Sequence, residues 1–116
     1  MRNKKAQKIA QKRLKAAQKL LNEGKKDMFY DEVLKSTWTY LSDKLSILPA
    51  ELTKERVTAE LEDRKIEAAL ADSFIQILNT CEFARYAPNT GQKEMGNLYS
   101  EAIDAITTLE QAIKKG

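Results

Sequence analysis

Apolar residues recur at spacings of three and four positions along most of this chain, and this helical period constrains the fold more than any other feature. No stretch keeps the strict two-residue alternation that is typical of a half-buried strand. Helix-breaking residues are few, with four glycines and two prolines among 116 residues. The pattern predicts an all-α fold: a compact bundle of about five helices in a single domain.

The first two helices are expected to form a hairpin. One spans about 3–23 and ends at Gly24, because glycine accepts the left-handed conformation at a helix end. The next spans about 27–46, and the short link between them predicts antiparallel packing. The spacing of leucines, glycine and aromatics is like that of one tetratricopeptide (TPR) hairpin, but no repeat at about 34 residues is visible downstream. An ordinary hairpin in a bundle core is the simpler interpretation.

Three further helices are expected in the second half. Thr53 has the residue type and position of an N-cap for a short third helix that ends near Asp63. A fourth helix is predicted over about 66–86, before Pro88 blocks its continuation. Asn89, with Gln92 three residues later, is the expected cap of the last helix.

Charge is divided unevenly along the chain, whose formal net charge is +3. Residues 1–26 carry ten basic groups and one acid, which gives +9, whereas residues 27–116 carry ten basic groups and sixteen acids, which gives −6. We interpret 1–26 as a basic helix continuous with the bundle, and 27–116 as the remainder of the same domain. The basic residues expected next to a membrane are Arg2, Lys4, Lys5, Lys8, Lys12 and Arg13.

This density of cations is typical of the cytosolic side of a membrane span, and each cation near an anionic leaflet contributes about 1 kcal/mol of attraction. The apolar stripe of the basic helix is mostly alanine, so insertion into the lipid is not expected. Nucleic acid is the competing anionic partner. The acidic remainder and the lack of a readout motif argue against it.

The residues of catalysis are largely missing. The chain has no histidine, which excludes Ser-His-Asp and Cys-His catalysis and removes the commonest metal ligand. No glycine-rich phosphate loop is present, and one cysteine without histidine cannot make the usual zinc site. We therefore expect no enzymatic activity, cofactor or metal. Cys81 cannot form an internal disulfide, which fits a reducing compartment; we interpret it as a core residue, with a redox-sensing thiol as the minority alternative.

Several residues are candidates for contact with a protein partner. Trp38 lies on the apolar face of its helix and is expected in the core, whereas Tyr40 is expected to point elsewhere. Phe83 falls off the apolar stripe, which indicates either a second packing surface within the domain or a partner contact. The candidate partner-binding residues are Tyr40, Glu82, Phe83, Arg85 and Tyr86.

Three stretches also resemble a known family. They are FYDEVL at 29–34, WTYLSDKL at 38–45 and CEFARYAP at 81–88, of which the last is the most specific. Together they look like the C-terminal cytosolic region of the BatD aerotolerance (oxygen-tolerance) family, and the resemblance extends over nearly the whole chain.

The resemblance implies a location and a set of partners. Proteins of this family look like membrane proteins with a signal peptide, extracytoplasmic β-sandwich domains, a membrane span and then this tail. The chain would then be part of a longer membrane protein, on the cytoplasmic face of the bacterial inner membrane. The implied partners are von Willebrand A-type membrane proteins, a TPR protein and a MoxR-type AAA+ ATPase. The implied function is a non-enzymatic scaffold, and the resemblance transfers no site residue. A free-standing basic helical protein that binds nucleic acid remains the alternative.

Overall fold

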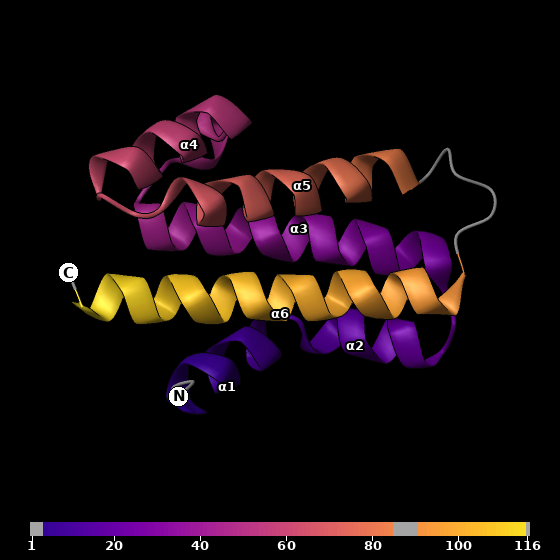
Figure 1. Cartoon of the computed structure of the whole chain (residues 1–116). Coiled ribbons are helices and arrows are strands. Elements are labelled where there is room, and N and C mark those ends of the chain that lie inside the picture. The colour runs from indigo at the N-terminus through magenta and orange to yellow at the C-terminus, as the bar shows by residue number, and fades with distance from the viewer. Residues whose placement is uncertain (1–3, 85–90, 116) are drawn as a thin grey trace.

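The computed structural model describes residues 4–84 and 91–115, with side chains through residue 113. All the regular structure in these residues is helical, so the predicted all-α bundle is confirmed (Figure 1). Six α-helices are present, one more than expected, together with a short 3-10 turn, η1. They are α1 (Lys4–Arg13), α2 (Lys15–Asn22), α3 (Lys26–Leu45), η1 (Pro49–Glu51), α4 (Lys54–Asp63), α5 (Ala68–Ala84) and α6 (Gln92–Lys115).

The longest helix, α6, runs through the middle of the bundle. It packs against α1 and α2 on one side and against α3 and α5 on the other (Figure 1). The short α4 lies at the outer edge, on α5 and α3. The shared core contains the fully buried rings of Phe29, Tyr40 and Phe74.

The prediction of a single helix over 3–23 is wrong in one respect, because the helix is divided at Leu14. This residue has φ −107° and ψ 16°, outside the helical range, although Gln18 N–H still donates to its carbonyl at 2.9 Å. The Leu14 side chain is fully buried. The change of direction lets α1 pack mainly on α6 while α2 packs mainly on α3, so two different neighbours impose a break that the sequence period does not show.

The turn between α2 and α3 confirms the predicted role of Gly24. Its φ is +69°, in the left-handed region that glycine tolerates best. Lys25 N–H donates to Leu20 O at 3.0 Å and Gly24 N–H donates to Leu21 O at 3.1 Å, which together make a Schellman motif. The chain reverses here, and α3 packs back along α2.

The start of α4 was also predicted correctly. Thr53 is its N-cap, and the hydroxyl oxygen accepts a 3.0 Å hydrogen bond from Arg56 N–H. The helix ends in a second Schellman motif, in which Ile66 N–H donates to Leu61 O at 3.0 Å and Lys65 takes the left-handed position at φ +61°. Because Ile66 is used in this turn, α5 begins at Ala68 and not at the predicted residue 66.

The N-terminus of α6 differs from the expected cap. Asn89 lies outside the described residues. Gln92 was expected to support that cap, but its side-chain amide donates a 2.7 Å hydrogen bond to Leu21 O at the end of α2. Glu94 instead accepts a 3.0 Å hydrogen bond from Gly91 N–H. This is the carboxylate half of a capping box that begins two residues later than predicted.

Candidate interaction surfaces and a buried polar cluster

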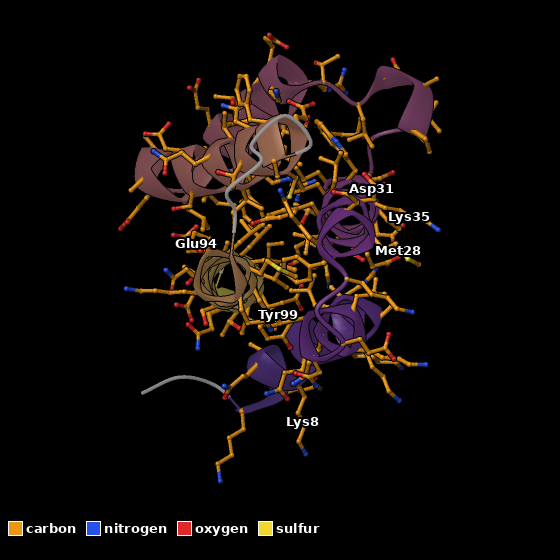
Figure 2. The ribbon with its side chains drawn as sticks, turned by 90° about the vertical axis from the view of Figure 1, so that its right-hand side faces the viewer. Lys8, Met28, Asp31, Lys35, Glu94 and Tyr99 are labelled. Carbon is orange, nitrogen blue, oxygen red and sulfur yellow. The ribbon has the colours of Figure 1, made fainter. Side chains whose placement is uncertain are left out.

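A row of lysines covers the outer side of α1 and α2. We define the lysine stripe as the five exposed residues Lys4, Lys8, Lys12, Lys15 and Lys19. Each stands two positions from a buried alanine, at residue 6, 10 or 17, and two positions turn about 200° around a helix. The lysines therefore point away from the core, as Lys8 does in Figure 2. Residues 4–22 contain seven basic residues and no acid.

Of the other predicted membrane-proximal residues, Lys5 is exposed as well, and Arg2 lies outside the described residues. Arg13 is only partly exposed and turns towards the bundle. Its guanidinium donates a 2.8 Å hydrogen bond to Asp43 on α3 and sits 5.5 Å from the centre of the Tyr40 ring. Arg13 thus helps to hold α1 on α3, and we leave it out of the stripe.

The expectation that Tyr40 faces a partner is wrong. Its side chain is fully buried, and its hydroxyl donates a 2.6 Å hydrogen bond to Glu110 Oε2 on α6. Lys44 Nζ lies 2.9 Å from the same oxygen. The physical reason is that α3 packs against α2, α4, α5 and α6, so a position off its main apolar stripe still faces another helix. Trp38, expected in the core, is half-buried against it.

The surroundings of Tyr40 also change its acidity. Burial raises the pKa of the phenol well above its usual range, and the hydrogen bond to Glu110 and the charge of that carboxylate act in the same direction. The Tyr40 ring stacks on Phe74 with centroids 6.5 Å apart. The phenol therefore stays protonated and serves as a fixed donor between α3 and α6.

Glu110 is the residue that sequence reasoning missed. It is 3% exposed, yet it carries a carboxylate. It stands four positions after Ile106 and three before Ile113, on the apolar face of α6. An acid in such a stripe was the available signal, since buried carboxylates need a partner.

The end of α5 is the exposed part of the predicted partner surface. The Phe83 side chain is 71% exposed, and it lies next to Gln76, Asn79 and Thr80 along one face of the helix. It therefore does not form a second packing surface among the described residues. Glu82 accepts a 2.6 Å hydrogen bond from Lys54 Nζ on α4. Arg85 and Tyr86 lie outside the described residues.

Cys81 faces the inside of the bundle. It is 1% exposed, and burial raises the pKa of its thiol to about 12, with the nearby charges of Glu82 and Asp31 adding to the effect. A reactive thiol needs exposure and a lowered pKa. The environment of Cys81 is the opposite, which favours the core interpretation over redox sensing.

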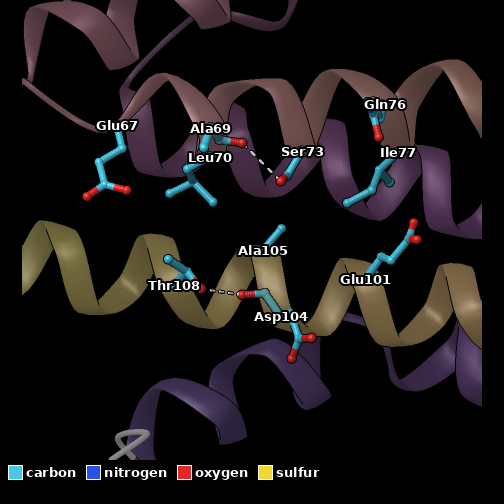
Figure 3. A pocket seen from close by; sticks show the side chains of 10 residues that line it. All are labelled: Glu67, Ala69, Leu70, Ser73, Gln76, Ile77, Glu101, Asp104, Ala105 and Thr108. Carbon is cyan, nitrogen blue, oxygen red and sulfur yellow. Dashed lines mark hydrogen bonds between the residues drawn. The ribbon is translucent and has the colours of Figure 1, made fainter.

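A groove follows the line between α5 and α6. One hollow of about 420 Å³ is lined by residues that include Glu67, Leu70 and Thr108, and a second of about 630 Å³ shares these three. The second hollow is also lined by Arg64 and Lys65, just after α4, so we call only the 420 Å³ hollow the α5–α6 groove. Figure 3 shows Leu70 and Ile77 from α5 and Ala105 from α6 pointing into it.

The described parts of the chain show neither a metal-binding cluster nor a membrane-spanning helix. No group of three or more Cys, Asp and Glu side chains within residues 4–84 and 91–113 is placed to hold a metal ion. None of the helices described above has the length and apolar character needed to cross a membrane.

Compared with models of known protein families, with curated proteins and with solved structures, the chain shows no match. What it does must therefore be argued from its own residues.

Proposed function

We propose that this chain is a non-enzymatic interaction domain that lies against the cytosolic face of a bacterial inner membrane and docks protein partners. The lysine stripe is the observation that supports it most directly. Five outward ammonium groups along two consecutive helices give an anionic leaflet several attractive contacts of about 1 kcal/mol each.

The rest of the chain supports a fixed orientation on such a surface. Residues 27–116 carry a net charge of −6, so an anionic leaflet on balance repels the rest of the domain and attracts the side with the stripe. Between the lysines, the exposed residues Gln11, Ala16 and Gln18 offer little apolar surface. Contact is therefore electrostatic and peripheral, without insertion into the lipid.

The resemblance to the BatD family gives the proposal its biological setting. In this setting the chain is the cytosolic tail of a longer membrane protein, and its partners are von Willebrand A-type proteins, a TPR protein and a MoxR-type AAA+ ATPase. The hairpin of α2 and α3 is then a TPR-like unit. The exposed Phe83 on α5 is available to a partner, because it lies away from the stripe on α1 and α2.

Vesicle flotation tests the membrane contact. We expect the domain to float with phosphatidylglycerol-containing vesicles at low salt and to be released from them at high salt. We expect no binding to vesicles of pure phosphatidylcholine. The triple variant Lys8→Gln, Lys12→Gln and Lys15→Gln should bind about a hundredfold more weakly, because three contacts of about 1 kcal/mol are lost. The control carries Lys35→Gln, Lys65→Gln and Lys93→Gln, three exposed lysines outside the stripe, and should bind nearly as well as the wild type.

Two outcomes would count against the proposal. Equal weakening by both triple variants would show that net charge acts without the stripe. Tighter binding to duplex DNA or RNA than to anionic vesicles at the same salt would favour the nucleic-acid alternative. Docking is tested by co-precipitation from detergent-solubilised membranes. Recovery of a von Willebrand A-type protein or the MoxR-type ATPase, reduced by Phe83→Ala, would support the scaffold role, and recovery of neither would oppose it.

A further inference from the structure

The α5–α6 groove has a floor of small and aliphatic side chains. Leu70, Ile77 and Ala105 are buried and point into the space between the two helices (Figure 3). Ala69 lies on its α5 wall and is exposed. Alanines on both helices leave room for another chain to approach closely.

Apart from the amide of Gln76, the polar side chains of the groove offer hydrogen-bond acceptors to a ligand. The Ser73 hydroxyl donates to Ala69 O at 3.0 Å, and the Thr108 hydroxyl donates to Asp104 O at 2.8 Å (Figure 3). Each hydroxyl has one proton and donates it to a carbonyl of its own helix. Only the lone pairs of these two hydroxyl oxygens therefore remain for a ligand.

Two carboxylates add charge to this acceptor surface. Glu67 and Glu101 stand towards the two ends of the hollow in Figure 3. Among the residues that the structure describes, neither carboxylate makes an ion pair or hydrogen bond, whereas Glu82 and Glu110 are each paired with a lysine. The 420 Å³ hollow is lined by no basic residue.

We propose that the α5–α6 groove is a docking site for a basic amphipathic helix of a protein partner. Lysine or arginine side chains of that helix would meet Glu67 and Glu101, and its small apolar residues would lie over Leu70 and Ala105. The charge of the groove selects a cationic partner, and its acceptors select one rich in N–H donors. An anionic polymer such as nucleic acid is repelled.

This inference builds on the proposed role as an interaction domain, but it concerns a different surface. The groove lies between α5 and α6, whereas the lysine stripe lies on α1 and α2. A domain held on a membrane by its stripe therefore keeps the groove open to a second partner.

The test measures binding of a fluorescent synthetic peptide to the whole chain by anisotropy. The probe has the sequence of residues 4–22 and serves as a basic amphipathic helix; a second peptide has its seven basic residues changed to glutamine. We expect the basic peptide to bind and the neutral one to bind at least tenfold more weakly. The double variant Glu67→Gln and Glu101→Gln should weaken binding of the basic peptide tenfold or more.

Two further variants separate shape and local charge from net charge. Ala69→Trp fills the groove without changing charge and should also abolish binding. Glu51→Gln with Asp63→Asn removes two exposed acids outside the groove and should leave binding unchanged. Circular dichroism checks that each variant is folded.

The proposal is overturned if the basic peptide does not bind, if both peptides bind equally, or if the Glu67/Glu101 variant binds like the wild type. Equal weakening by the Glu51/Asp63 control would overturn it as well. The Glu67/Glu101 variant should bind anionic vesicles as strongly as the wild type does. Loss of vesicle binding by the wild type with retained peptide binding would reject the membrane role and leave the groove proposal standing.

Discussion

Tyr40 donates a 2.6 Å hydrogen bond to Glu110 although the two residues are 70 positions apart. The bond joins α3 to α6 inside the bundle, and Lys44 neutralises the same carboxylate from its more exposed side. Arg13 lies over the Tyr40 ring and pairs with Asp43, which brings α1 into the same cluster. Polar contacts thus connect three helices, α1, α3 and α6.

Tyr40→Phe should lower the free energy of unfolding by about 2 kcal/mol, because a buried hydrogen bond to a charged acceptor is lost. Urea denaturation measures the change. A double-mutant cycle with Glu110→Gln should give a coupling of about 1 kcal/mol or more. Tyr99→Phe is the control, since no described residue bonds the hydroxyl of that half-buried tyrosine, and it should change stability by under about 0.5 kcal/mol. Equal effects of the two Tyr→Phe changes would contradict the prediction.

Thr37→Val should raise the free energy of unfolding by about 1 kcal/mol. Thr37 Oγ1 is buried and has no hydrogen-bond partner among the described residues, so replacing it with a methyl group removes a desolvated hydroxyl without leaving a cavity. Thr107→Val is the matched control. That buried hydroxyl donates to Ile103 O at 2.7 Å, so the same change should bring no gain. A loss of stability in Thr37→Val would show that its hydroxyl is satisfied in solution.

The local features of the fold were predictable from the sequence. Gly24 and Thr53 end and begin helices through contacts within a few residues, so residue type and position were enough. The break at Leu14 was not predictable, because it depends on α1 and α2 packing on different helices. Lys65 was missed for a related reason: a lysine in the left-handed position has no sequence signal, and the turn is imposed by the packing around Ile66.

The candidate surfaces likewise include residues that the sequence predicted and residues that it did not. Three residues of the lysine stripe, Lys4, Lys8 and Lys12, were among those predicted from the sequence. The structure adds Lys15 and Lys19 to them and shows that Arg13 turns inward. The burial of Tyr40 could not be read from one helix, because the period of α3 marks its main apolar face but not how many neighbours surround it. The α5–α6 groove depends on two helices that the sequence does not place side by side.

Lys65→Gly should stabilise the domain by about 0.5–1 kcal/mol. A non-glycine residue at φ +61° carries left-handed strain of about 1 kcal/mol, which glycine relieves at some cost in unfolded-state entropy. Thermal denaturation should show a higher Tm. The control Lys93→Gly, at an exposed position in the first turn of α6, should destabilise by up to about 1 kcal/mol. A lower Tm for Lys65→Gly would mean that the Lys65 side chain makes a stabilising contact larger than the strain.

The Cys81 thiol should make the domain less stable at alkaline pH. Its pKa in the fold is about 12, against about 8.5 in an unfolded chain. Above about pH 8.5 the unfolded chain loses the thiol proton while the folded chain keeps it. The stability that this thiol contributes at lower pH is therefore lost as the pH rises towards the folded pKa. The slope is at most about 1.4 kcal/mol per pH unit. Tyr40 adds a loss of the same sign at higher pH, because its pKa is also raised in the fold.

Comparison with Cys81→Ala isolates the thiol from the other titrating groups. Urea denaturation at several pH values between about 7 and 10.5 should show the wild type losing stability faster than the variant above the unfolded thiol pKa. The variant is expected to start lower at neutral pH, because it leaves a small cavity in the core around α3 and α5. The two curves should therefore converge as pH rises. Parallel curves would mean that the thiol titrates alike in both states, which its burial does not allow.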